Sequence, residues 1–157
     1  MTDSCPRCDV AAGRSNTPGG VIHDDGLWLV VHHPGPTTDP GELLVMLRRH
    51  EESLARLTDA ETAALGPILR AGIVAIERVV RPERVYVASF NERVRHVHFF
   101  LLPRTSAMPS GHVTSDLFRR VRGLFRGWRI ARNPTTEARA QAAQRIRDED
   151  VWRRLPA

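Results

Sequence analysis

Short apolar blocks separated by turn residues occupy the first third of the chain, a pattern more typical of strands than of helices. Residues 21–23 and 27–33 flank Asp24-Asp25-Gly26, residue types that are favoured in tight turns, so together they predict a β-hairpin. Residues 42–48 (ELLVMLR) form a nearly continuous apolar run, which indicates a third strand buried on both faces. Proline and glycine are frequent over residues 32–41, and we expect a loop there.

The clearest helical pattern follows His50. Thr58 and Glu61 have the spacing of a capping box, in which each side chain binds the other residue's backbone amide at the start of a helix. Apolar residues then recur at helical spacing as far as residue 79, and Pro82 ends the pattern. We expect a long helix here, with one face packed against the strands.

Two further strands are predicted in the middle of the chain. Residues 84–90 (RVYVASF) and 96–102 (HVHFFLL) are rich in β-branched and aromatic residues, and the polar segment 91–95 connects them tightly. Pro103 is expected to stop the second of these strands.

The last third of the chain carries helical patterns instead. We expect one helix over about residues 116–125 and another from Thr135 or Thr136 to about residue 154. Strands, a long helix, two more strands and then helices predict an α+β fold with a five-stranded, mainly antiparallel sheet. At 157 residues the chain is most naturally one domain.

The composition excludes one kind of covalent catalysis and favours an anionic partner. The formal net charge is +5 and every basic residue is arginine, so no lysine can act as a nucleophile or form a Schiff base. A basic surface suits an anionic partner, and the fork of arginine donors suits phosphate. No apolar run is long enough to cross a bilayer and no signal peptide is visible, so we expect a cytoplasmic protein without membrane contact.

Both cysteines lie in the motif Cys5-Pro6-Arg7-Cys8. Two cysteines do not make a disulfide framework, which leaves a redox pair or a metal site. A thioredoxin-like redox pair opens a helix directly after a strand, whereas this motif precedes residues 9–20, where glycine and proline predict a loop. The position favours a metal site.

The strand that contains His96 and His98 is the strongest candidate for chemistry. Side chains alternate along a strand, so these two residues and Phe100 share one face while Val97 and its apolar partners face the core. Two Cα atoms two residues apart lie roughly 6.5–7 Å apart, which lets two imidazoles flank a phosphate or reach a metal. A single strand histidine is usually only a hydrogen-bonded, half-buried residue, but two on one face after a polar turn favour a functional site.

The segment His96-Val97-His98-Phe99-Phe100-Leu101-Leu102 resembles the His-φ-His-φ-His-φ-φ signature of the histidine-triad superfamily of nucleotide hydrolases and transferases. The hairpin, the third strand ending at His50, the long helix and the Asn91-Glu92 turn also follow the order of that family, over roughly residues 5–104. The resemblance implies a catalytic domain over residues 1–104 with the family's α+β fold. Residues 105–157 would form a helical extension packed on the same domain, and a homodimer is expected.

The resemblance also implies a mechanism. His98 would attack the α-phosphorus of a nucleoside phosphate ester, anhydride or phosphoramidate and form a nucleotidyl-histidine intermediate, which water or another acceptor resolves. Its second ring nitrogen would donate to the backbone carbonyl of His96. The nucleotide or nucleotidyl conjugate would be bound by five further residues: His33, Asn91, Glu92, Arg93 and Arg95.

Zinc-bearing members of the superfamily, including the galactose-1-phosphate uridylyltransferases that the chain resembles in part, imply a metal site. The matching ligands are Cys5, Cys8, His50 and His96, a closed set that fits one structural zinc per chain. Two alternatives stay open. His50 could instead cap the segment that follows it, or His96 and His98 could hold an open catalytic zinc with His32 or His33, which leaves the cysteines unused.

Phe100 departs from the family pattern, because most members have a third histidine there and the uridylyltransferases have a glutamine. Phenylalanine cannot exchange a proton, and general acid catalysis is typically worth ~10²–10⁴ in rate. The alternative to an enzyme is therefore a catalytically weakened nucleotide-binding protein. A further alternative is a nucleic-acid-binding face on the arginine-rich segment 119–132, although a packed helix with solvated arginines is the more common explanation.

Overall fold

The structure is a computed structural model that describes residues 5–35, 38–106 and 134–155. Its centre is one sheet in the strand order β1-β2-β3-β5-β4, in which every pair of neighbours is antiparallel. This confirms the predicted five-stranded α+β fold. The strands are β1 (Val21–Asp24), β2 (Trp28–His32), β3 (Leu43–Leu47), β4 (Arg84–Ala88) and β5 (His98–Arg104).

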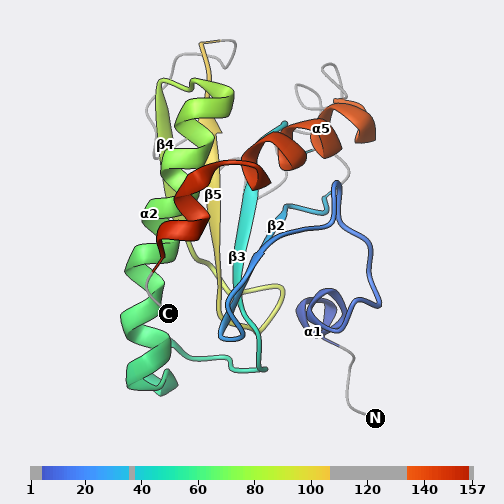
Figure 1. Cartoon of the computed structure of the whole chain (residues 1–157). Coiled ribbons are helices and arrows are strands. Elements are labelled where there is room, and N and C mark those ends of the chain that lie inside the picture. Colours follow the sequence, from blue (N-terminus) through green and yellow to red (C-terminus); the bar gives the residue numbers. More distant parts are fainter. Residues whose placement is uncertain (1–4, 36–37, 107–133, 156–157) are drawn as a thin grey trace.

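Helices lie on both sides of these strands (Figure 1). The long helix α2 is on one side, together with α5, and the short helix α1 lies on the opposite side of the strands from α2. The helical elements are α1 (Pro6–Ala11), η1 (Leu54–Arg56), α2 (Asp59–Val80), α5 (Thr136–Arg147) and η2 (Asp150–Arg154).

Helix α2 begins as the sequence predicts. The Thr58 hydroxyl accepts a hydrogen bond from the Glu61 amide at 3.2 Å, and the Glu61 carboxylate accepts one from the Thr58 amide at 2.8 Å. Gly72 lets the helix approach the sheet closely, because a β-carbon there would lie 2.5 Å from Leu101 Cδ1. The helix ends at Val80, with Arg81 in the left-handed region just before Pro82.

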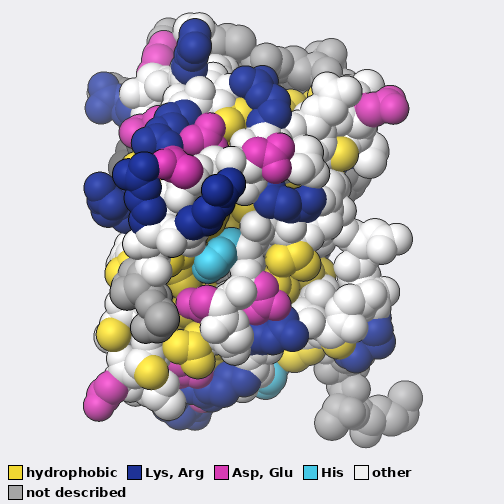
Figure 2. Space-filling model, in the orientation of Figure 1, with side chains coloured by type: hydrophobic (Ala, Val, Ile, Leu, Met, Phe, Trp, Pro, Cys, Tyr) yellow, Lys and Arg dark blue, Asp and Glu magenta, His cyan; other side chains and the backbone are white. Residues whose placement is uncertain are grey.

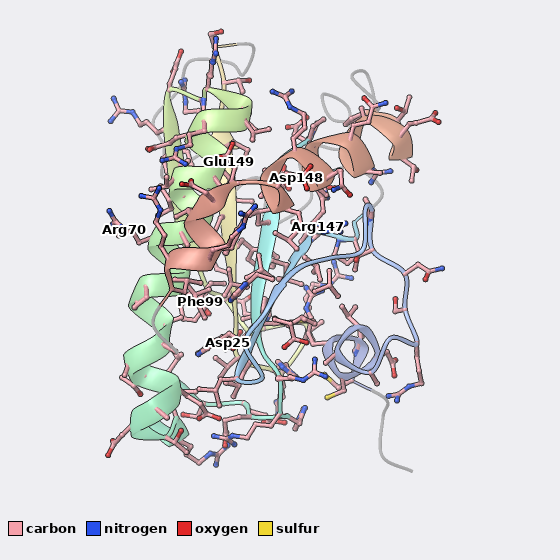
Figure 3. All side chains as sticks on the ribbon, in the orientation of Figure 1. Asp25, Arg70, Phe99, Arg147, Asp148 and Glu149 are labelled. Carbon is pink, nitrogen blue, oxygen red and sulfur yellow. The ribbon has the colours of Figure 1, made fainter. Side chains whose placement is uncertain are left out.

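The sheet buries side chains on both faces, and all residues of β2 and β3 are buried. The core on the α2 side includes Trp28, Val97 and Leu101, and Figure 3 shows Phe99 on this side as well. On the opposite face Val10 of α1 packs with Leu29, Val31, Leu44 and Met46 of the strands. The burial predicted for residues 42–48 on both faces is confirmed for 42–47, whereas Arg48 is exposed, and α1 covers the second face.

Two predicted boundaries of β5 are wrong. The strand begins at His98 rather than at residue 96, because the Val97 amide and carbonyl bond to Glu51 and Leu47 outside the ladder. It also continues through Pro103, which pairs with Val85 of β4. Pairing with β3 ends at Leu101, so at Pro103 the strand has only β4 as a neighbour. On its other side no strand requires the amide hydrogen that proline lacks.

The two ends of the described chain also differ from prediction. Part of the loop expected over residues 9–20 is helix α1, which starts because Pro6 in its first turn is already set for helical geometry. The helix expected to reach residue 154 ends at Arg147, and the chain turns into η2. That turn lets the Trp152 indole donate to the Ile146 carbonyl at 2.8 Å within the core. The predicted helix 116–125 and the arginine-rich segment 119–132 lie outside the described residues.

Helix α5 is fastened to the start of β1. The Arg147 side chain reaches back across this junction (Figure 3) and donates to the backbone carbonyls of Gly19 and Val21, the latter at 2.7 Å. A β-carbon on Gly19 would lie 2.6 Å from Ala143 Cβ, so the two segments touch without room for a side chain. Arg139, which is buried, donates to the Gly35 carbonyl at 2.7 Å and so links α5 to the loop after β2.

The surface near α2 and η2 carries charges of both signs. Figure 2 shows arginine side chains mixed with acidic ones on this face. Arg78, for example, forms ion pairs with Glu149 and Asp150 at 3.0 and 2.8 Å. Among the described helices, none combines the length and the apolar character needed to cross a membrane.

Candidate functional site

Four predicted metal ligands meet at one point of the molecule, where α1 approaches the residues just before β5. The ligand atoms of Cys5, Cys8, His50 and His96 all lie within 4.8 Å of one another. Nδ1 of His96 is 3.5 Å from Cys5 Sγ and 3.7 Å from Cys8 Sγ, and Nδ1 of His50 is 3.4 Å from Cys8 Sγ. A tetrahedral zinc has sulfur–nitrogen separations of about 3.6 Å, given its usual bond lengths, so the four residues fit zinc.

Each ligand is placed by local structure. Cys5 is the N-cap of α1 and Cys8 lies one turn later, so the spacing of the motif puts both thiols on one side of the helix. Nε2 of the fully buried His96 ring lies 2.7 Å from the Leu47 carbonyl, and donation there leaves Nδ1 unprotonated toward the sulfurs. Burial and the adjacent Cys5 raise the pKa of the Cys8 thiol to about 11, which a metal cation between the thiols would reverse.

His98 lies directly beyond this cluster, at the first position of β5. Its Nδ1 is 2.5 Å from the backbone carbonyl of His96, so it donates its hydrogen there and leaves Nε2 as the unprotonated nitrogen. The residue is only 3 % exposed. Burial lowers the pKa of His98 to about 4, and the positive charge of Arg7 acts in the same direction. The ring is therefore neutral at pH 7, the state in which imidazole is a nucleophile.

No protein-family model and no curated protein sequence matches the chain. Solved structures do resemble it. A Hit-like protein involved in cell-cycle regulation from Bartonella henselae is 15% identical, with a TM-score of 0.67 over 94% of this chain and 96% of that one. A zinc-bound histidine triad family protein from Mycobacterium smegmatis is 17% identical, with a TM-score of 0.65 over 92% and 93% of the two chains. The chain has the histidine-triad fold.

A further neighbour with the histidine-triad fold is a hypothetical histidine triad nucleotide-binding protein from Sulfolobus tokodaii. It is 14% identical, with a TM-score of 0.66 over 92% of this chain and 90% of that one. The fold that the sequence resemblance implied is thus confirmed, while the partial resemblance to the uridylyltransferases stays a prediction.

Phe100 is the residue that the sequence resemblance aligns with the third histidine of the motif. Its ring meets the His98 ring edge-on with centroids 4.9 Å apart, and the His33 ring lies 5.2 Å away on another side. Nδ1 of His33 accepts a hydrogen bond from the Gly35 amide at 3.1 Å. The structure therefore brings the rings of both His33 and His98 against Phe100, while the predicted nucleotide-binding role of His33 stays a prediction.

His32 points away from this group. Its Nδ1 is 3.1 Å from the His33 carbonyl and its Nε2 accepts from the Gly41 amide at 3.2 Å, so both nitrogens hold the loop after β2. Within residues 5–35, 38–106 and 134–155, His98 belongs to no group that could hold a metal ion. The alternative of an open zinc held by His96, His98 and His32 or His33 receives no support.

The turn between β4 and β5 carries the remaining predicted residues. Asn91 has a left-handed backbone with φ of 48°, and its side-chain oxygen is buried without a hydrogen-bond partner. Glu92, Arg93 and Arg95 are exposed. Because their contacts do not include His98, their predicted roles stay predictions.

Arg7 is the residue that sequence reasoning missed. It is 8 % exposed, and its charge acts on both His96 and His98. Its position between two cysteines of a metal motif was the available signal, since the residues inside such a motif are held close to the site. A cavity of about 350 Å³ lies elsewhere, between α2 and η2, and is lined by none of these residues.

Proposed function

We propose that the chain is a nucleotidyl hydrolase or transferase that acts on a nucleoside phosphate ester, anhydride or phosphoramidate through a covalent intermediate on His98. The observation that carries this proposal is the 2.5 Å contact between His98 Nδ1 and the His96 carbonyl. A backbone carbonyl can only accept, so it fixes the tautomer in which Nε2 has a lone pair for attack. The name of the Sulfolobus neighbour, which describes that protein as nucleotide-binding, agrees with a nucleotide substrate.

The reaction consists of two displacements at phosphorus. The Nε2 lone pair of His98 forms a phosphorus–nitrogen bond, and the bond to the leaving group breaks with its electron pair. Water or another acceptor hydroxyl then attacks the same phosphorus, releases its proton to solvent, and returns the electron pair to Nε2. Retention of configuration at phosphorus is the expected consequence of two inversions.

Cys5, Cys8, His50 and His96 would hold one zinc ion per chain as a structural site. A zinc with four protein ligands supplies rigidity rather than an open coordination position. The four residues join α1 to the segment after β3 and to the start of β5. Because His96 also accepts the hydrogen bond from His98, a fixed His96 gives a fixed nucleophile.

His33, Asn91, Glu92, Arg93 and Arg95 would contact the nucleotide. The unpartnered buried oxygen of Asn91 is an acceptor, which suits a ribose hydroxyl better than a phosphate. The proximity of His33 to Phe100 supports a place for it beside the leaving group. We also expect a homodimer, which light scattering of the purified chain tests.

A second candidate function rests on Phe100. Its ring packs edge-on against His98 and offers no proton to a leaving group, which favours a nucleotide-binding protein with little or no turnover.

The decisive experiment is covalent trapping. The full chain is incubated with a panel of adenylated and uridylated compounds and then denatured, and bound nucleotide is measured by mass spectrometry. Label is expected on the unmodified chain and none on the His98→Ala variant. The matched control is His23→Gln on β1, whose ring stacks on Trp152 at 5.2 Å and lies outside the site.

Three outcomes are distinguishable. Label that depends on His98 supports the enzyme, and nucleotide binding without label or turnover supports the weakened protein. If no compound binds, both nucleotide functions are wrong. Metal analysis is run in parallel, with about one zinc per chain expected and loss of zinc in Cys8→Ser; a metal-free, fully folded protein contradicts the zinc site.

A further inference from the structure

Arg7 is a buried charge for which the described part of the chain supplies no counter-charge. The side chain lies in the first turn of α1, between the two cysteines, and only 8 % of the residue is exposed. Its Nε is buried without a hydrogen-bond partner. Among the described residues no carboxylate lies within ion-pair distance of its guanidinium, whereas Arg14, Arg49 and Arg78 each have an acidic partner.

Such a side chain is costly to keep in a folded protein. Removal of a guanidinium from water is strongly unfavourable unless an anion and hydrogen bonds compensate for the lost hydration. Burial accordingly lowers the pKa of Arg7, and the only opposing influence comes from Cys5. A zinc ion with two thiolates and two neutral imidazoles has no net charge, so the loaded metal site would not neutralise the arginine.

Helix α1 places Arg7 close to the residues that position His98. Helix α1 covers the sheet face that carries Leu44 and Met46, and His98 pairs with Met46 across the β3–β5 ladder. The thiols of the two cysteines that flank Arg7 lie 3.5 and 3.7 Å from His96 Nδ1, and the His96 carbonyl in turn contacts His98 Nδ1 at 2.5 Å. The buried guanidinium is thus held under α1, on the sheet face against which Phe100, the neighbour of His98 on β5, also packs.

We propose that Arg7 binds the phosphate that His98 attacks, and that the natural substrate is a phosphoanhydride of a nucleotide. This inference rests on the proposed function and specifies its substrate class. Arginine offers forked donors that match phosphate oxygens and stabilises the charge that develops in the transition state. It replaces the charge of the absent third histidine, but it does not replace the proton, because a guanidinium stays protonated.

The lack of a proton donor selects the leaving group. Phe100 has no proton to give, and Nδ1 of His33 is already occupied as the acceptor of the Gly35 amide hydrogen. When Nε2 of His98 attacks an anhydride, the bridging P–O bond breaks and its electron pair remains on a phosphate oxygen that needs no proton. The nitrogen of a phosphoramidate, in contrast, must be protonated before it leaves.

The test compares Arg7→Gln, which removes the charge, with Arg7→Lys, which keeps it. The control is Arg14→Gln, an exposed arginine that pairs with Asp9 on the same segment of the chain. Calorimetry on the zinc-loaded full chain measures the affinity for AMP and UMP, for adenosine and uridine, and for inorganic pyrophosphate. Zinc content and the thermal midpoint are measured for every variant.

We expect Arg7→Gln to weaken the binding of the monophosphates by roughly 10- to 100-fold, with lysine restoring part of it. Nucleoside affinity and zinc content should not change. The thermal midpoint without ligand should stay the same or rise, because an uncompensated charge has been removed. A midpoint that falls, or equal losses for monophosphates and nucleosides, assigns Arg7 a structural role and overturns the proposal.

Failure of the proposed function gives a different result. If the unmodified chain binds no nucleotide or nucleoside, that function is wrong, and pyrophosphate alone decides about Arg7. If the unmodified chain binds pyrophosphate and Arg7→Gln abolishes that binding, the phosphate site at Arg7 is supported. If the unmodified chain does not bind pyrophosphate, the proposed phosphate site is wrong as well. For the leaving group, turnover of a nucleoside diphosphate and of a nucleoside phosphoramidate is compared. A phosphoramidate cleaved as fast as the anhydride overturns the substrate class.

Discussion

The contact between Gly19 and α5 predicts a sharp difference between two glycine substitutions. Gly19 and Gly13 both have a positive φ, 74° and 70°. A β-carbon on Gly19 would lie 2.6 Å from Ala143 Cβ and 2.9 Å from the Ala140 carbonyl oxygen, whereas nothing lies within 4 Å of one on Gly13. Gly13→Ala therefore measures the backbone cost alone, and Gly19→Ala measures the backbone cost plus the clash.

The expected magnitudes follow from these two contributions. A left-handed backbone costs a residue with a side chain about 1–2 kcal/mol, which both variants share. Excess volume in a packed interface adds typically 1–3 kcal/mol, and here the obstacle includes the backbone of α5, which cannot rotate away. Gly13→Ala should lower the free energy of unfolding by about 1–2 kcal/mol, and Gly19→Ala by about 2–5 kcal/mol in total.

Urea unfolding followed by circular dichroism gives both values, with the zinc concentration held constant because a bound metal shifts apparent stability. The m-value should be the same for both variants, since neither alters the area exposed on unfolding. If Gly19→Ala costs no more than Gly13→Ala, then α5 does not pack against the start of β1, and the account of the C-terminal helix is wrong.

Three further results are expected. Chelation of the metal should lower the thermal midpoint of the unmodified chain but not that of Cys8→Ser, as differential scanning calorimetry can show; equal responses would mean that the cysteine is not a ligand. Phe100→His should raise the turnover of a phosphoramidate by up to ~10²–10⁴, because it supplies the missing acid, and an unchanged rate in the zinc-loaded variant would contradict that role. The hydrogen bond from Arg49 lowers the pKa of Glu61 to about 2, so stability should fall as the pH drops from the ordinary value of 4.5 toward 2. Glu61→Gln should flatten this dependence in acid unfolding curves, and an unaltered slope would exclude Glu61 as its source.

The sheet and the long helix were predictable because local signals and burial agree there. Thr58 and Glu61 form the capping box, and the apolar run over residues 42–48 became a strand with both faces covered. Helix α1 was missed because six residues give no periodicity to detect, and its stability comes from contacts such as Val10 on the sheet. The continuation of β5 through Pro103 depends on where β3 stops pairing, which is a tertiary property.

The candidate site shows the same division. The spacing of Cys5 and Cys8 and the two strand histidines were visible in the sequence, and the structure brings the four ligands together. The hydrogen bond from His98 to the His96 carbonyl was expected only from the family resemblance, because every residue has a backbone carbonyl and residue type alone gives no signal for such a contact. Arg7 could not be predicted from the sequence, because what distinguishes it from other arginines is its burial and the lack of an acidic partner among the described residues. Neither property can be inferred from the residue type.

The ligand set of the metal site has a consequence for how the protein is made. Cys5 and His96 stand 91 positions apart in the chain, yet their side chains are within 3.5 Å in the folded protein. During synthesis both thiols leave the ribosome well before the two histidines that complete the site. Until His96 follows, they are unshielded nucleophiles, open to oxidation or to a foreign metal. With the proposed zinc site, the early thiols would make the supply of zinc and reductant a determinant of how much protein matures correctly.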